Sequence, residues 1–152
     1  MNGAVVTGIS SDLVTAISEH TGAFTGNFTI TNSDYTLAEL KTINDATSGS
    51  ITLLTTTTAL SGSSSDLAAA FAGTVTTHTG TVGISNADYS VAELKTINAA
   101  STGAITFTTA TTALSDTSSN LAVALNGTTN HNAAVTVTNA DYTAAELATI
   151  NN

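Results

Sequence analysis

Apolar residues alternate with threonine in several short segments of the chain. Phe28 and Ile30 alternate with Thr29 and Thr31, and the segment 135–138 repeats the pattern. Successive side chains of a strand point to opposite faces, so each segment has one apolar face and one face of threonine hydroxyls. The pattern predicts strands that begin near residues 28, 51, 82, 105 and 135. Residues 4–7 are a candidate for a sixth strand.

Between these segments, apolar residues recur at helical spacing. Leu13 and Ile17 lie four residues apart on one face, and the same pairing recurs at Leu67 and Phe71 and at Leu121 and Leu125. A second set of helices begins with a hydroxyl residue followed three positions later by glutamate, the signature of a capping box. These pairs are Thr36 and Glu39, Ser90 and Glu93, and Thr143 and Glu146. Gly49 and Gly103 are expected to end two of these helices.

The strongest signal is an internal repeat. The phrase DYTLAELKTIN from Asp34 returns as DYSVAELKTIN from Asp88 and as DYTAAELATIN from Asp141. A second phrase, SSDLVTAIS from Ser10, returns in step from Ser64 and Ser118. Self-similarity at a fixed period of 53–54 residues predicts one repeat domain over residues 1–152, with repeats at approximately 1–48, 49–102 and 103–152.

One helix between successive strands implies parallel strands and right-handed crossovers. Alternating strands imply that only one face of the sheet is covered. We therefore expect a right-handed α/β solenoid of about three repeats, each with two β-α units, with a parallel sheet on one face and helices on the other. The apolar-x-apolar-x-Asn phrase at 28–32, 82–86 and 135–139 resembles that of leucine-rich repeats. The intervening units carry Thr55 and Thr109 instead, so this resemblance concerns the architecture.

The composition of the chain excludes several classes of function. Thr, Ala and Ser supply 33, 25 and 16 of the 152 residues. The chain has 11 acidic side chains and only two basic ones, Lys41 and Lys95, which gives a net charge of −9. Such a chain has no basic patch for a nucleic-acid backbone or a polybasic membrane contact. The absence of cysteine excludes disulfides, thiol chemistry and cysteine-based zinc sites. The start of the chain does not resemble a signal peptide, and no apolar run is long enough to insert into a membrane.

The segments AELKTINDATSGSITL from Ala38 and AELKTINAASTGAITF from Ala92 resemble the Thr/Ala-rich tandem repeats of giant secreted or cell-surface proteins of cyanobacteria and other marine bacteria. This resemblance implies an extracellular structural or adhesive role. The glycine-rich calcium-binding nonapeptide that often accompanies such proteins is absent, so calcium-driven folding is not implied.

The repeated acids and the histidines are the remaining candidates for chemistry. Asp34, Asp88 and Asp141 lie in turns, and their hard oxygen ligands would suit calcium. Because no D-x-D-x-D-G loop is present, no cofactor is expected, and calcium bound along these turns is the alternative. His20, His78 and His131 lack metal-ligand spacing and are expected in surface loops; the first-repeat counterpart of the latter two lies near Phe24. No catalytic residue is assigned, because no G-x-S-x-G elbow occurs and repeated units do not suit a single active site.

The outward threonines form the candidate binding surface. Thr29, Thr31, Thr52, Thr106, Thr108, Thr136 and Thr138 are expected on one flat sheet face. Regular T-x-T rows resemble the faces of ice-binding solenoids, although solvated strand positions also favour threonine.

These observations predict a non-enzymatic structural or adhesive module of an extracellular surface protein, filament or layer. Its expected partners are head-to-tail copies or adjoining repeats, because neither end carries a polar capping repeat. The alternative is a module that binds ice, polysaccharide or another surface through the threonine face. Neither nucleic-acid binding nor membrane insertion is expected.

Overall fold

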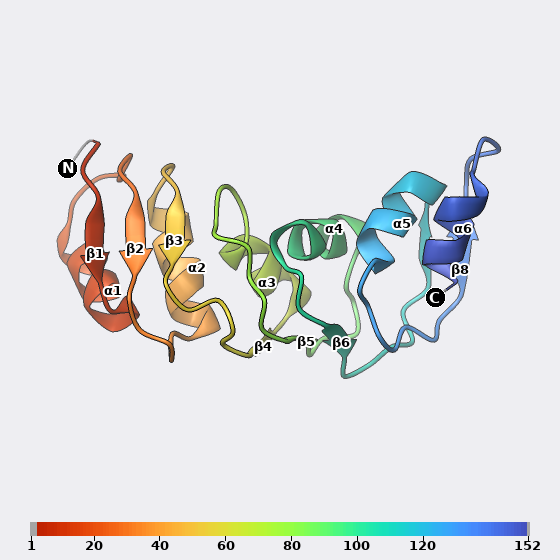
Figure 1. The fold of residues 1–152 in the computed structure, drawn as a ribbon, viewed down its shortest axis with the longest axis horizontal. Coiled ribbons are helices and arrows are strands. Elements are labelled where there is room, and N and C mark those ends of the chain that lie inside the picture. Colours follow the sequence, from red (N-terminus) through yellow and green to blue (C-terminus); the bar gives the residue numbers. More distant parts are fainter. Residues whose placement is uncertain (1–2, 152) are drawn as a thin grey trace.

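The computed structural model describes residues 3–151 as an elongated α/β molecule with its two termini at opposite ends (Figure 1). Residues 1–2 and 152, the outermost positions of the first and third predicted repeats, lie outside the described residues. The described part contains six helices and eight short strands, which confirms the α/β class.

All strand pairs are parallel, as predicted. The strands are β1 (Val6–Gly8), β2 (Phe28–Ile30), β3 (Ile51–Leu53), β4 (Leu60–Gly62), β5 (Val82–Ile84), β6 (Ile105–Phe107), β7 (Leu114–Asp116) and β8 (Val135–Val137). The helices are α1 (Ser10–Glu19), α2 (Leu37–Ala46), α3 (Ser64–Ala70), α4 (Val91–Ala100), α5 (Ser118–Leu125) and α6 (Ala144–Ile150).

The sequence prediction missed β4 and β7. Both follow threonine-rich runs, at 55–58 and 108–112, that lack the alternation of apolar residues and threonine, and each lies one 54-residue period after its predecessor, β1 or β4. The first two 54-residue periods therefore hold three strands and two helices each, instead of the two strands and two helices expected.

The expectation of one sheet is also wrong, because the strands form three small sheets with the orders β1-β2-β3, β4-β5-β6 and β7-β8. Consecutive helices, in contrast, pack against one another along the whole chain. Two packed helices occupy about 16–20 Å along the molecule, whereas three neighbouring strands occupy about 14–15 Å. Because these lengths differ, one unbroken sheet does not stay aligned with the row of helices. The first and second sheets accordingly have different orientations in Figure 1.

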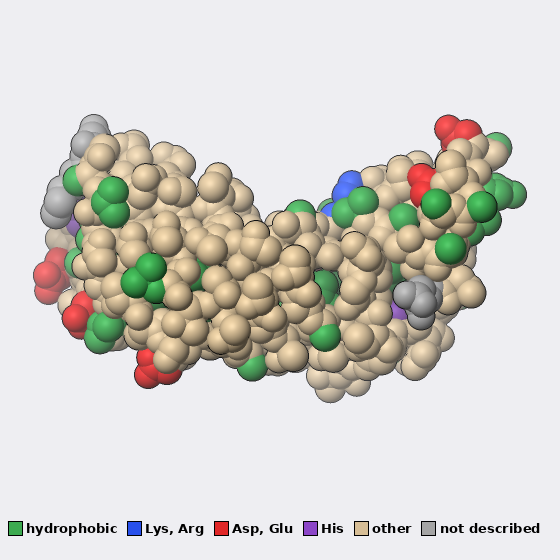
Figure 2. Space-filling model, in the orientation of Figure 1, with side chains coloured by type: hydrophobic (Ala, Val, Ile, Leu, Met, Phe, Trp, Pro, Cys, Tyr) green, Lys and Arg blue, Asp and Glu red, His purple; other side chains and the backbone are tan. Residues whose placement is uncertain are grey.

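The core lies between the strands and the helices. Phe28 and Ile30 are buried while Thr29 between them is partly exposed, which confirms the predicted alternation. Leu40 and Ile43 of α2 and their counterparts in α4 close the core from the helical side. Figure 2 shows a bent molecule whose acidic side chains gather toward the two ends of the visible face, with a largely uncharged stretch between them.

Gly49 and Gly103 do not end helices as predicted. Helices α2 and α4 end at Ala46 and Ala100, and extended residues follow them. A Cβ atom at Gly49 would overlap the carbonyl oxygen of Gly26, and one at Gly103 would overlap that of Gly80. Both glycines are therefore required by the close approach of neighbouring chain segments.

Candidate functional site

The predicted capping boxes are present at the start of α2, α4 and α6. In α2, Thr36 Oγ1 accepts a hydrogen bond from the backbone nitrogen of Glu39 at 3.3 Å, and Glu39 Oε2 accepts one from the backbone nitrogen of Thr36 at 2.8 Å. Ser90 with Glu93 and Thr143 with Glu146 form the same arrangement. Two backbone donors at the start of each of these helices are satisfied in this way.

Each capping glutamate also joins two helices. Ser10 Oγ, at the start of α1, donates to Glu39 Oε2 at 3.1 Å. The backbone nitrogen of Ser10 donates to Asn32 Oδ1 at 2.9 Å, and Asn32 Nδ2 donates to Asp34 Oδ1 at 2.8 Å. The same four-residue cluster recurs as Ser64, Asn86, Asp88 and Glu93, and as Ser118, Asn139, Asp141 and Glu146.

The hydrogen bonds of these clusters favour ionised carboxylates. The donated bonds from Asn86 and Asn139 lower the pKa of Asp88 and Asp141, respectively. Although desolvation opposes ionisation of Glu39, the hydrogen bonds from Thr36 and Ser10 hold its pKa below the ordinary value. The backbone and side chain of Thr143 lower the pKa of Glu146 in the same way. These carboxylates thus accept hydrogen bonds from other residues of the same chain, which gives them a structural role.

A second interhelical contact was not predicted. Asn44 Nδ2, near the end of α2, lies 2.7 Å from the carbonyl oxygen of Ala69 and 3.0 Å from that of Ala70 in the last turn of α3. Asn98 of α4 makes the corresponding contacts with the carbonyl oxygens of Val123 and Asn126 at the end of α5. The recurrence of asparagine after Lys-Thr-Ile was a signal for this role, since helix ends leave carbonyl oxygens without partners.

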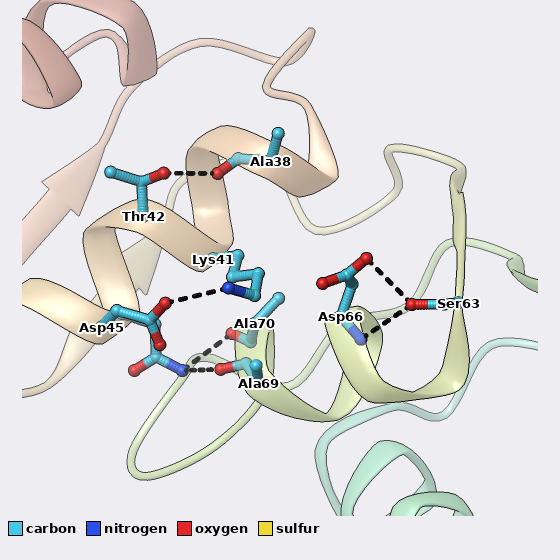
Figure 3. A network of polar contacts seen from close by, with 9 residues as sticks. Ala38, Lys41, Thr42, Asp45, Ser63, Asp66, Ala69 and Ala70 are labelled. Carbon is cyan, nitrogen blue, oxygen red and sulfur yellow. Dashed lines mark hydrogen bonds and ion pairs between the residues drawn. The ribbon is translucent and has the colours of Figure 1, made fainter. Parts of the chain in front are cut away.

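The two lysines have different partners although they are repeat counterparts. Lys41 pairs with Asp45 in the next turn of α2 at 3.1 Å, and Asp66 accepts a hydrogen bond from Ser63 (Figure 3). Lys95 donates instead to Asn120 Oδ1 of the following helix at 2.5 Å. Asn120 takes the place of Asp66 in the third repeat, so this position tolerates a neutral acceptor.

The structure divides the predicted threonine face among the three sheets. Thr29 and Thr52 lie side by side on β2 and β3, and Thr7 of β1 completes their row. Thr106 pairs with Gly83, and Thr136 pairs with Ser115. Thr31, Thr108 and Thr138 lie exposed just after their strands. The expected flat face is thus wrong, and the first sheet carries the one row made wholly of threonine among the described strands.

The prediction of surface histidines is wrong for His78, which is fully buried. His78 occupies the place of the buried Phe24, because Phe24 pairs with Thr47 as His78 pairs with Ser101. Its Nε2–H donates to the carbonyl oxygen of Thr58 at 2.8 Å, and burial lowers its pKa. His131 Nε2 lies 3.1 Å from the carbonyl oxygen of Thr112, and His20 stacks on Phe24; both are partly exposed.

Among residues 3–151, no three His, Cys, Asp or Glu side chains are grouped in a way that could hold a metal ion. No helix in this range is long and apolar enough to cross a membrane. Comparison with known proteins finds no matching family model, no similar curated protein and no similar solved structure.

Proposed function

We propose that this chain is a non-enzymatic structural or adhesive repeat module, built as an α/β solenoid, of an extracellular surface protein, filament or layer. The observation that supports this most directly is the repeated cluster that links Ser10 to Glu39 and recurs in the next two repeats. The polar residues of this cluster join one unit to the next. In repeat proteins, each unit contacts only its neighbours, and such contacts hold the array together. The extracellular location rests on the resemblance to secreted tandem repeats.

We further propose that the module associates end to end. Tyr35 and Tyr89 are 1% and 2% exposed, whereas their counterpart Tyr142 is 52% exposed. Leu40 and Leu94 are fully buried, whereas Leu147 is 38% exposed. At the opposite end, Val5 and Ile9 are 61% and 43% exposed. Apolar surfaces at the two ends of an elongated molecule favour head-to-tail contacts, which do not close into rings and so extend into filaments.

Sedimentation velocity and electron microscopy of the concentrated protein test this proposal. We expect particles that lengthen with concentration, and the Leu147→Asp variant to remain monomeric. The control is Leu54→Asp, because Leu54 is 63% exposed but lies just after β3, away from both ends of the molecule. Wild-type protein that stays monomeric at high concentration, or equal loss of association in both variants, would contradict the proposal.

The threonine row of the first sheet supports an alternative function. Thr7, Thr29 and Thr52 lie on three adjacent strands, which are spaced about 4.7–4.9 Å apart. We propose that this row binds ice, a polysaccharide or another repetitive surface if the end-to-end contact is not the main activity. Thermal hysteresis and glycan binding test it. Thr29→Lys should abolish either activity, whereas Thr106→Lys, on the second sheet, should leave thermal hysteresis intact and weaken glycan binding less than Thr29→Lys does. Equal effects of both substitutions would contradict a role for this row.

A further inference from the structure

An asparagine followed by a glycine ends helix α5. Asn126 is the C-terminal capping residue of this helix and has extended backbone angles, and Gly127 follows it with a φ of +76°. This left-handed backbone conformation favours glycine. The first and second repeats carry Ser18 and Ala72 in the place of Asn126, so the pair is peculiar to the third repeat at this turn.

Both residues of the pair are exposed to solvent. Ala72 and Gly73 hold the same places in the second repeat, and they are exposed as well, although the whole third repeat follows them. The exposure of Asn126 and Gly127 is therefore a property of this turn, and it does not depend on where the sequence stops.

The groups of this pair that can react are free of hydrogen bonds within the described chain. The backbone nitrogen of Asn126 donates to the carbonyl oxygen of Ala122 at 3.1 Å. The side chain of Asn126 and the backbone nitrogen of Gly127, in contrast, make no hydrogen bond with any residue of the range 3–151. A Cβ atom at Gly127 would meet nothing within 4 Å, so the space around this nitrogen is open.

Asn130, four residues further along, shows the opposite situation. Its Oδ1 accepts from the backbone nitrogen of Phe107 at 2.8 Å, and its Nδ2 donates to the carbonyl oxygen of Phe107 at 2.8 Å. The amide of Asn130 is thus held on both sides, and a bulky residue, His131, follows it. The same loop therefore contains one free asparagine and one that is fixed in place.

We propose that Asn126 is a site of spontaneous deamidation. The backbone nitrogen of Gly127 attacks Cγ of Asn126, the bond from Cγ to Nδ2 breaks, and ammonia leaves with the proton of the attacking nitrogen. Water then opens the resulting five-membered succinimide ring at either carbonyl, which gives aspartate or isoaspartate. One water molecule is consumed for each ammonia released, and no oxidant, metal or enzyme is required.

The modification changes the junction between the second and third repeats. Asn98 of α4 donates to the carbonyl oxygen of Asn126, and the carbonyl oxygen of Gly127 accepts from the nitrogen of Ile105 at 3.2 Å. Isoaspartate lengthens the main chain between residues 126 and 127 by one carbon, so these two contacts do not keep their present geometry. The new carboxylate also lies at the C-terminal end of α5, where a negative charge opposes the helix dipole. Because neighbouring units hold a repeat protein together, we expect the modified chain to be less stable.

Incubation of the whole protein at pH 8, followed by peptide mapping with mass spectrometry, tests the proposal. Enzymatic methylation of isoaspartate identifies the product of the succinimide route, and the fragment map separates residue 126 from the other Asn-Gly pair at residues 2–3. We expect aspartate and isoaspartate at position 126 and unchanged asparagine at position 130. The rate in the folded protein should be within about tenfold of the rate in urea, because no local unfolding has to precede the reaction.

Two variants connect the chemistry with stability. Asn126→Ala, which copies the second repeat, should keep its Tm during the incubation, whereas the Tm of the wild type should fall as the isoaspartate fraction rises. Asn126→Asp carries the new charge without the longer main chain, so its Tm should fall less than that of the isoaspartate form. Unmodified Asn126 in the folded protein under conditions where the unfolded chain reacts, or an equal loss of Tm in Asn126→Ala, would overturn the proposal.

Discussion

The side-chain nitrogen of Asn44 lies 2.7 Å from the carbonyl oxygen of Ala69, so that a residue of α2 caps the end of α3. Removal of the amide leaves carbonyl oxygens of the last turn of α3 without a protein partner. The contact is partly open to water, which satisfies some of the loss.

We expect Asn44→Ala to lower the free energy of unfolding by about 1 kcal/mol in urea titrations. Thr42→Ala is the control, since Thr42 is exposed on the same helix and its hydroxyl donates only within α2, to Ala38. Equal stability of the two variants would show that the contact between helices contributes nothing.

The burial of His78 predicts a pH dependence near neutrality. Its pKa in the fold lies below the ordinary 6.5, so the unfolded chain binds more protons between those two values. Stability from the neutral imidazole is complete above pH 6.5 and is lost as the pH falls through the pKa of the folded state.

His78→Phe, which copies the first repeat, should remove this pH dependence. The measurement is Tm from pH 7.5 to pH 5, and each kcal/mol corresponds to about 2–4 °C for a chain of this size. His20→Ala should retain the slope of the wild type. If the dependence of Tm on pH is unchanged in His78→Phe, another titratable group causes that dependence.

The capping carboxylates predict a second loss of stability in more acidic solution. The pKa of Glu39 in the fold lies below its ordinary 4.5, so its contribution is present above pH 4.5 and disappears as the pH falls through the lowered value. Glu39→Gln should cost about 0.5–1 kcal/mol at pH 7 and reduce the loss of stability in acid.

Glu19→Gln serves as the matched control, because Glu19 lies at the C-terminal end of α1, where a negative charge opposes the helix dipole. Chemical denaturation at pH 7 and pH 3.5 compares the variants. A larger effect of Glu19→Gln than of Glu39→Gln would contradict the role of the capping box.

Because the backbone of Gly80 approaches Gly103 closely, we expect that position 103 does not accept a side chain larger than that of glycine. Gly103→Ala places a methyl group against a backbone oxygen, and we expect a loss of about 1–3 kcal/mol or more. Gly8→Ala is the control, since its Cβ atom would meet Leu13 at an ordinary 3.5 Å. Differential scanning calorimetry measures both variants, and equal Tm values would show that the chain relaxes around the methyl group.

Local chemistry explains why the helices were predictable. Thr36 and Glu39 carry a capping signature whose geometry depends only on neighbouring residues, and the structure contains it. The strand around Phe28 was equally clear from its alternation. In contrast, β4 has only Leu60 as a buried apolar residue, followed by Ser61 and Gly62, so its pattern is too weak to be read without the repeat.

The candidate site was less predictable because it depends on tertiary geometry. Where the sheets break is determined by how far strands and helices advance together, and this separates Thr52 from Thr106. His78 lies in a polar, threonine-rich segment that is typical of a loop. Only its alignment with Phe24 indicates that its side chain belongs to the core. The role of Asn44 depends in the same way on the position of the neighbouring helix.

The break into three sheets also determines which kinds of surface the threonine rows fit. Since the first and second sheets differ in orientation, a rigid plane that lies flat on Thr29 and Thr52 does not lie flat on Thr106. A flexible polymer, in contrast, follows the bend and meets each row in turn. The number of rows engaged at once, and therefore the avidity of any such contact, depends on the stiffness of the partner.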